Sequence, residues 1–197
     1  VCWNPASSRI FLIFGAVDYT CEVSINGKDA GSHKGGYEAF SMDITDALQE
    51  QNTLTICCLD DLEDQSYPYG KQTLKRGGMW YTPVSGIWQT VWLESVPENH
   101  IENLRIENRG YSVTISIEPA TIHVHTGHEN AKIEILDGET LAATGCGCDA
   151  DIVVPDAKLW SDETPNLYTL YITVADETGN VVEAIPMDVG FRTFEMK

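Results

Sequence analysis

The chain has 197 residues, of which 43% are hydrophobic and 21% charged, so it can bury a folded core and is not a disordered segment. Its 12 basic and 30 acidic side chains give a formal charge of −18, which would repel nucleic acid and anionic membranes. No apolar run approaches the roughly 20 residues that span a bilayer. Nucleic acid and membrane are therefore excluded as expected partners.

The sequence opens Val1-Cys2-Trp3, with no initiator Met and no leader, and we interpret it as an excised piece of a longer protein. Six cysteines at irregular spacing favour free, partly buried thiols over a disulfide framework. This cysteine usage is typical of a reducing compartment.

Strand patterns dominate the first half of the chain. Residues 10–14 form a continuous apolar run, which predicts a strand buried on both faces. Residues 21–25 alternate strictly between apolar and polar, and Asn26-Gly27 after them predicts a type I′ hairpin turn. Further alternating runs lie at residues 40–44 and 54–58. Helix signals are confined to residues 45–51, with Thr45 as the expected cap.

The stretch 87–93 predicts a strand with bulky apolar groups on both faces. Ile87, Val91 and Leu93 share one face, and Trp88 and Trp92 share the other. Burying a Trp side chain is worth about 2–3 kcal/mol. We therefore expect both tryptophans to be largely buried, and the chain to self-associate if it cannot cover them itself.

The alternating pattern stops at residues 97–100, where turn formers indicate a linker. Strand patterns resume beyond it, at residues 113–117, 121–126, 132–136, 152–154, 170–174 and 181–182. About seven short strands in 100 residues are typical of an immunoglobulin-like sandwich. The sequence predicts two all-β domains, at residues 1–97 and 98–197.

Three segments, at residues 14–45, 70–94 and 159–193, go beyond generic strand patterns. They contain the runs Val23-Ser24-Ile25-Asn26-Gly27, Gly77-Gly78-Met79-Trp80-Tyr81, Ser85-Gly86-Ile87-Trp88 and Val189-Gly190-Phe191-Arg192. Together they resemble glycoside hydrolase family 2, the β-galactosidase, β-glucuronidase and β-mannosidase group. The first two segments resemble its sugar-binding, jelly-roll-like (galactose-binding-like) domain, and the third resembles its immunoglobulin-like domain.

The resemblance implies a parent enzyme that hydrolyses terminal β-linked sugars with retention, using two glutamates on a following (β/α)₈ barrel. This chain stops at Lys197, and it contains no Asn-Glu dipeptide resembling the family's acid/base motif. We therefore expect a non-catalytic fragment of a cytoplasmic, bacterial enzyme, with secretion left open, and an incomplete first sandwich. The expected partners are carbohydrate, the protein's own catalytic barrel and, as an open alternative, further copies of itself. No catalytic residue, metal or cofactor is expected.

The acidic and aromatic loop at residues 60–80 is the expected contribution to a sugar pocket, because hydroxyl groups need acceptors and sugar rings stack on aromatic faces. The side chains assigned to this pocket are Asp61, Glu63, Asp64, Tyr67 and Trp80. The alternative interpretation is a solvated acidic loop whose aromatic side chains pack between domains.

A second cluster, of His123, His125, His128, Cys146 and Cys148, has a spacing that a soft divalent metal could use. Strand alternation instead favours histidines on the solvent face, so no metal site is assigned. The alternatives to the enzyme fragment are a standalone carbohydrate-binding module and an interaction sandwich whose acidic surface serves solubility.

Overall fold

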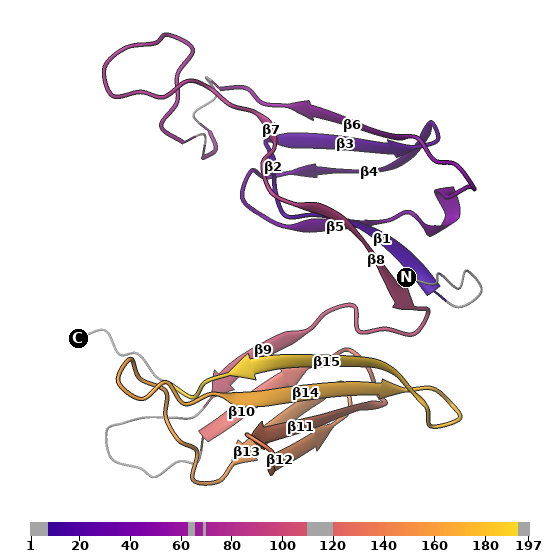
Figure 1. Cartoon of the computed structure of the whole chain (residues 1–197), viewed down its shortest axis with the longest axis vertical. Helices are drawn as coiled ribbons and strands as arrows, with labels where there is room; N and C mark the ends of the chain where they lie inside the picture. The colour runs from indigo at the N-terminus through magenta and orange to yellow at the C-terminus, as the bar shows by residue number, and fades with distance from the viewer. Residues whose placement is uncertain (1–7, 63–65, 69, 110–119, 193–197) are drawn as a thin grey trace. The chain divides into compact units, whose positions relative to one another are not determined.

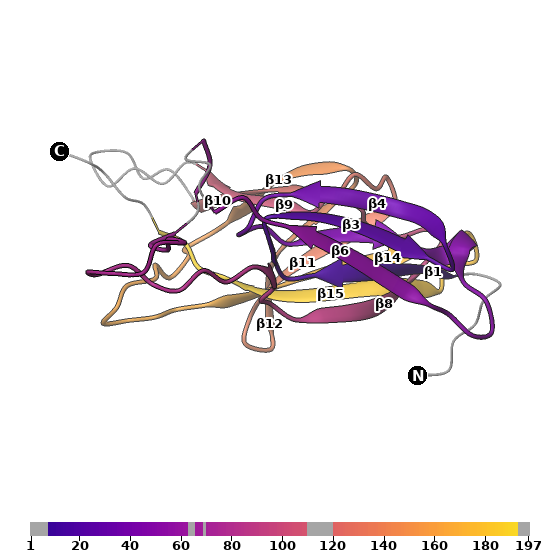
Figure 2. The same ribbon diagram turned by 90° about the horizontal axis from the view of Figure 1, so that it is seen from above.

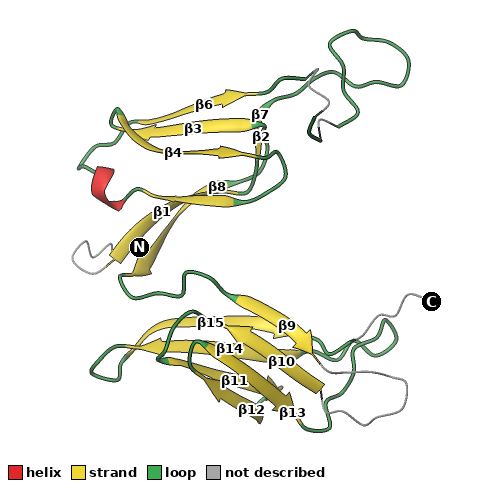
Figure 3. Cartoon of the chain, turned by 180° about the vertical axis from the view of Figure 1, so that it is seen from behind, coloured by secondary structure: helices red, strands yellow, loops and turns green. Residues whose placement is uncertain are grey.

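The computed structural model describes residues 8–62, 66–68, 70–109 and 120–192. The chain divides into two compact units, Val1–Glu98 (unit 1) and Asn99–Lys197 (unit 2). Figure 3 shows that the described residues are almost entirely strand and loop, with one short helical turn. No helix among the described residues is long and apolar enough to cross a membrane.

Unit 1 is a jelly-roll-like sandwich of two three-stranded antiparallel sheets (Figure 1). One sheet has the order β5-β1-β8 and the other the order β4-β3-β6, and a two-residue pair, β2-β7, lies at one end. The strands are β1 (Ser8–Phe14), β2 (Val17–Asp18), β3 (Thr20–Ile25), β4 (Lys28–Lys34), β5 (Phe40–Asp43), β6 (Leu54–Leu59), β7 (Gly86–Ile87) and β8 (Val91–Pro97).

The core of unit 1 lies between the inward faces of β1 and β3. Ile10, Leu12 and Phe14 alternate along β1 with half-buried neighbours, so this strand is fully buried on one face and not on both. Cys21, Val23 and Ile25 supply the opposite layer from β3, and their burial follows the alternation of the sequence. The hairpin after β3 is confirmed, because Asn26 and Gly27 have φ of 55° and 77°, as a type I′ turn requires.

Two further expectations for unit 1 are wrong. The helical signal at residues 45–51 gives only a 3₁₀ turn, Thr45–Ala47, and Thr45 does not cap it. The Thr45 hydroxyl accepts a 2.8 Å hydrogen bond from the Ile10 amide and donates one of 2.6 Å to Asp43. The short turn therefore serves to tie the end of β5 to β1.

Trp88 and Trp92 are 52% and 42% exposed within the chain, against the expectation that they are buried. Both sheets of unit 1 end in an edge strand, β6 in one and β8 in the other, with no further strand beside them in the described part. Leu93 pairs with the buried Leu12 and shares its face, yet it is 63% exposed. The sandwich is thus open along β8, and no described strand covers the bulky side chains there.

Unit 2 is an immunoglobulin-like sandwich of a three-stranded sheet, β13-β10-β9, and a four-stranded sheet, β12-β11-β14-β15 (Figures 1 and 2). Its strands are β9 (Arg105–Arg109), β10 (Ala120–His125), β11 (Ala131–Asp137), β12 (Thr140–Cys146), β13 (Asp149–Val154), β14 (Tyr168–Ala175) and β15 (Val181–Val189). The strand expected at residues 113–117 lies outside the described residues.

A buried tyrosine is hydrogen-bonded to the segment that connects β13 to β14. Tyr168 begins this strand, and its hydroxyl accepts a 2.8 Å hydrogen bond from the amide of Lys158, ten residues earlier. Its ring packs edge-to-face on Phe191, with ring centroids 5.2 Å apart. A tyrosine at this corner, bonded back to the preceding backbone, is characteristic of immunoglobulin-like sandwiches.

Candidate sugar-binding pocket

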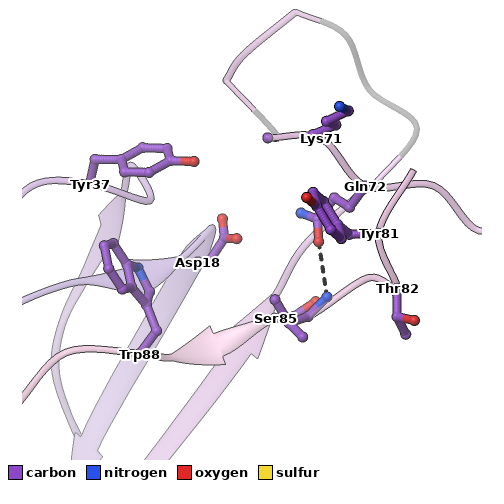
Figure 4. Close-up of a pocket in the computed structure, with 10 residues that line it drawn as sticks. Asp18, Tyr37, Lys71, Gln72, Tyr81, Thr82, Ser85 and Trp88 are labelled. Carbon is purple, nitrogen blue, oxygen red and sulfur yellow. Dashed lines mark hydrogen bonds between the residues drawn. The ribbon is translucent and has the colours of Figure 1, made fainter. Parts of the chain in front are cut away.

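The described part of unit 1 holds a cavity of about 350 Å³ beside the short β2-β7 pair (Figure 4). Three separate segments build it: the end of β2, the loop between β4 and β5, and the long connection between β6 and β8. The residues lining it are Asp18, Tyr37, Gly70, Lys71, Gln72, Tyr81, Thr82, Val84, Ser85 and Trp88.

Asp18 supplies the carboxylate of this pocket. Figure 4 shows its side chain pointing into the space between Tyr37 and Trp88 on one side and Gln72 and Tyr81 on the other. Partial burial raises the pKa of Asp18, and the nearby Asp60 carboxylate raises it further. Water cannot fully solvate a carboxylate that is partly buried in this way. A hydrogen bond from a neutral hydroxyl group therefore stabilises such a carboxylate.

Gly36 leaves space for the Asp18 carboxylate because it has no side chain. A Cβ at position 36 would lie 2.8 Å from Asp18 Oδ1, closer than real Cβ contacts allow. The loop also carries Tyr37, so one turn of backbone both accommodates the carboxylate and presents an aromatic ring next to it.

Two aromatic rings form one wall of the cavity. Tyr37 and Trp88 meet edge-to-face, with ring centroids 5.8 Å apart, and both are more than half exposed. The indole nitrogen of Trp88 donates a 2.7 Å hydrogen bond to the Gly36 carbonyl, which fixes the orientation of the ring. Exposed rings held in place in this way can stack on an apolar ligand face with little loss of conformational entropy.

The opposite wall is a loop that folds back on itself. The side chain of Gln72 is buried, and its Oε1 accepts a 2.9 Å hydrogen bond from the Val84 amide. The Tyr81 amide donates to the Lys71 carbonyl at 2.9 Å, and Lys71 Nζ lies 5.9 Å from the Tyr81 ring centroid. This network places a cation and a third aromatic ring across the cavity from Asp18.

Asp60 does not line the cavity, but it provides a second carboxylate near Asp18. The Ser85 hydroxyl donates a 3.0 Å hydrogen bond to Asp60 Oδ2, whereas Asp60 Oδ1 is buried without a hydrogen-bond partner among the described residues. A carboxylate, a buried amide, hydroxyls and three aromatic rings around one cavity match the needs of a sugar, which has hydroxyl groups at its rim and C–H groups on its faces.

The three described residues among those that the sequence assigned to the sugar pocket, Asp61, Tyr67 and Trp80, do not line this cavity. Trp80 is 47% exposed and is not among the lining residues. The Tyr67 ring stacks on Tyr19 with centroids 3.7 Å apart, and its hydroxyl donates a 2.5 Å hydrogen bond to the Asp61 carbonyl. Glu63 and Asp64 lie outside the described residues.

The sequence reasoning missed Asp18, Tyr37 and Trp88, although all three lie in segments that carry the family resemblance. The available signals were the paired glycines, Gly35-Gly36, directly before an aromatic residue, and an aspartate at the end of an apolar run. Neither signal points to a site until the fold brings the two segments together.

The histidine and cysteine cluster is dispersed in the structure. His123 and His125 lie on β10, and their Nδ1 atoms pair with Asp151 at 2.8 Å and Asp149 at 2.7 Å across the β10–β13 register. His128 pairs with Asn99, and Cys146 ends β12 in the other sheet. Within the described ranges, no three His, Cys, Asp or Glu side chains are arranged to hold a metal ion.

Comparison with known proteins gives the ancestry of the chain. It is 31% identical over 98% of its length to a protein of Formosa agariphila assigned as a beta-glucuronidase, and 29% identical over 97% to a beta-galactosidase of Clostridium acetobutylicum. The beta-glucuronidase structure of Ruminococcus gnavus matches 98% of the chain with a TM-score of 0.77 at 24% identity, so it shares the fold.

These relatives are all much longer than the chain. It spans 24% and 21% of the two sequence relatives and 33% of the solved structure. The protein-family profile described as "Glycosyl hydrolases family 2" matches residues 93–192, about half of the chain. The resemblance seen in the motifs is thereby confirmed, and the chain belongs to family 2 of the glycosyl hydrolases.

Proposed function

We propose that this chain is the non-catalytic, sugar-contacting part of a longer family 2 enzyme that hydrolyses terminal β-galactosides or β-glucuronides. The names of the two sequence relatives support this substrate range. The observation that carries the proposal is the Asp18 carboxylate, which lies beside the exposed rings of Tyr37 and Trp88 in an open cavity. In this role Asp18 accepts hydrogen bonds from sugar hydroxyls, and the two rings cover the apolar face of the sugar.

The chemical step needs two carboxyl groups about 5–5.5 Å apart if hydrolysis proceeds with retention. We infer that both come from a catalytic barrel outside this chain, with which the chain's own sugar contacts cooperate. In that arrangement unit 1 binds and orients the terminal sugar. It does not donate a proton to the leaving group or attack the anomeric carbon.

The acidic loop remains part of the proposal. Four of its residues, Asp61, Glu63, Asp64 and Tyr67, come soon after β6 in the sequence. The same connection continues into the cavity wall at Lys71 and Gln72 and then reaches Trp80. We propose that this loop makes outer contacts to the aglycone or to a second sugar unit, while Asp18 contacts the terminal sugar.

Turnover by the purified chain tests the division of roles. The chain is incubated with chromogenic β-galactoside and β-glucuronide beside a longer product of the same reading frame that includes the barrel. The proposal predicts hydrolysis by the longer product and none above buffer by the chain. Hydrolysis by the chain that survives repurification would overturn the proposal.

The competing function is a standalone carbohydrate-binding module, and affinity separates the two. A pocket that the rest of an enzyme completes binds a free monosaccharide with a Kd weaker than about 1 mM. A micromolar Kd in titration calorimetry, lost when the pocket residue Trp88 is changed in Trp88→Ala, would favour the standalone module.

We further propose a cytoplasmic location in a bacterium. The five cysteines among the described residues are all free thiols, as is usual in a reducing compartment. Labelling of intact cells with a membrane-impermeant thiol reagent tests this, because a cytoplasmic protein stays unlabelled until the cells are lysed.

A further inference from the structure

Two cysteines of unit 1 face each other across a pair of neighbouring strands. Cys21 in β3 is directly opposite Cys58 in β6, and the register of the two strands runs without a shift. Figure 1 shows β3 and β6 side by side. Both side chains point to the core face, where Cys21 is 1% exposed and Cys58 packs against the same cluster. The two thiols are near enough for each to influence the pKa of the other.

The hydrogen-bond pattern of the ladder makes this pair suitable for a disulfide. Asn26 and Thr53 are opposite each other at the end of the same ladder, and the Asn26 amide donates a 2.9 Å hydrogen bond to the Thr53 carbonyl. Asn26 and Thr53 are therefore a hydrogen-bonded pair. Pair types alternate along an antiparallel ladder, and Cys21 lies five steps from Asn26. Cys21 and Cys58 are therefore a non-hydrogen-bonded pair, whose Cα atoms are about 4.5 Å apart in general and within the range that a disulfide spans.

The other described cysteines do not share this arrangement. Cys57 adjoins Cys58 but lies on the opposite face of β6, where it is exposed. Cys146 and Cys148 belong to unit 2. Only the Cys21–Cys58 pair among the described residues combines direct opposition in one ladder with a shared face.

We propose that Cys21 and Cys58 form a reversible cross-strand disulfide when the protein meets a low-molecular-weight disulfide such as oxidised glutathione. Cys58, the more accessible thiol, attacks one glutathione sulfur, and the first glutathione leaves as a thiol. Cys21 then attacks the Cys58 sulfur of the mixed disulfide, and the second glutathione leaves with the Cys21 proton. Two protein thiols are oxidised and one glutathione disulfide is reduced to two thiols.

The bond would lie close in sequence to the pocket residue Asp18. Cys21 is three residues from Asp18 in the sequence, and Cys58 is two residues from Asp60. The Thr20 hydroxyl already joins the two strands next to the cysteines, because it donates a 2.8 Å hydrogen bond to the Leu59 carbonyl. Among the described strands, β6 pairs only with β3, so the disulfide would fasten an edge strand that backbone hydrogen bonds hold on one side. This inference depends on the strand register and does not require the proposed sugar function.

Burial sets the speed of the exchange. It raises the pKa of Cys21 to about 11, with Cys58 adding to the shift, and it raises the pKa of Cys58 as well. Only thiolates attack disulfides, so we expect the crosslink to form slowly at neutral pH and faster as pH rises.

Peptide mapping without reduction tests the proposal. The chain is incubated with oxidised glutathione, free thiols are blocked with N-ethylmaleimide, and tryptic peptides are analysed by tandem mass spectrometry. Trypsin separates the two cysteines, because Lys28 and Lys34 lie between them. The expected product is the Cys21 peptide linked to the Cys58 peptide with the loss of two hydrogens, and dithiothreitol reverses it.

Two variants assign the partner. The link should persist in Cys57→Ser, the matched control on the opposite face, and be absent in Cys58→Ala. The proposal would be overturned if wild type carried only glutathione adducts, or if Cys58 were linked to Cys57 or Cys2. The wild-type and Cys57→Ser maps decide the question even if Cys58→Ala does not fold.

Discussion

The indole nitrogen of Trp88 donates a 2.7 Å hydrogen bond to the carbonyl oxygen of Gly36, 52 residues earlier in the sequence. This bond joins the loop after β4 to the segment before β8, and the two together form the aromatic wall of the cavity. Neither segment forms the wall alone, since Tyr37 belongs to one and Trp88 to the other. The bond therefore links the folding of unit 1 directly to the shape of the candidate site.

Trp88→Phe should weaken this wall while leaving an aromatic ring in it. The variant loses one hydrogen bond with a net value of about 1 kcal/mol, so the free energy of unfolding of unit 1 should fall by roughly that amount. Urea unfolding followed through unit 1 amide signals in NMR spectra measures the change. Trp92→Phe is the matched control, because the Trp92 ring is exposed to a similar degree on β8 outside the cavity. Equal losses in both variants would contradict the role of the bond.

Gly36→Ala should impair sugar binding through Asp18. The added methyl group would lie 2.8 Å from Asp18 Oδ1 and push the carboxylate out of place, weakening binding on the order of tenfold, or about 1.4 kcal/mol. A double-mutant cycle with Asp18→Asn checks the route. The two effects should be strongly non-additive, because both variants disturb the same carboxylate. Simple additivity would show that Gly36→Ala acts elsewhere.

The raised pKa of Asp18 predicts that the charged carboxylate lowers the free energy of unfolding, and that this effect depends on pH. Burial and Asp60 make the folded protein bind a proton at Asp18 more tightly than the unfolded chain does. Stability therefore falls as pH rises from the ordinary value of 3.8 through the raised pKa. Asp18→Asn does not titrate, so it should be more stable than wild type at about pH 7 and lose that advantage below the ordinary Asp pKa.

Asp43→Asn provides the control of opposite sign. Burial alone would raise the pKa of Asp43, but hydrogen bonds from Thr45 and Arg9 outweigh burial and lower it. This carboxylate stabilises the fold above its ordinary pKa, and the gain is lost as pH falls through the lowered value. Asp43→Asn should therefore destabilise unit 1 near neutral pH, with a penalty that shrinks in acid. Parallel pH profiles for the two Asn variants would contradict at least one of the two assignments.

Tyr168→Phe should destabilise unit 2 by about 1 kcal/mol, because the Lys158 amide loses its acceptor. Tyr171→Phe is the control, since Tyr171 lies on the exposed face of the same strand. Denaturant unfolding followed through unit 2 amide signals distinguishes them. A loss of the same size at Tyr171 would mean that the corner bond contributes nothing of its own.

Local patterns predicted much of the fold. The alternation at residues 21–25 and the Asn26-Gly27 dipeptide are short-range features, and β3 with its turn follows them closely. The bulky residues around Trp92 were misread for a different reason. Apolar side chains on both faces of a strand indicate that both faces can be buried. Whether another part of the chain actually buries them depends on the rest of the sandwich.

The candidate site was harder to predict because it is made of distant segments. Asp18, Tyr37 and Trp88 lie between 19 and 70 residues apart in sequence, and no local period connects them. The sequence drew attention instead to residues 60–80, where carboxylates and aromatics are adjacent in the chain. Adjacency in the chain is a weak guide here, since Tyr67 packs on Tyr19 and Trp80 is outside the cavity lining.

The most direct test of the account is an NMR titration of the ¹⁵N-labelled chain with methyl β-galactoside and methyl β-glucuronide, to about 50 mM sugar. The account predicts shift changes for the Trp88 indole signal and for the Asp18 and Tyr37 amides with one of the sugars. These changes should fit a Kd weaker than about 1 mM and be abolished in Asp18→Ala. Unchanged signals at these three residues with both sugars, or changes confined to unit 2, would contradict the assignment of the pocket as a sugar site.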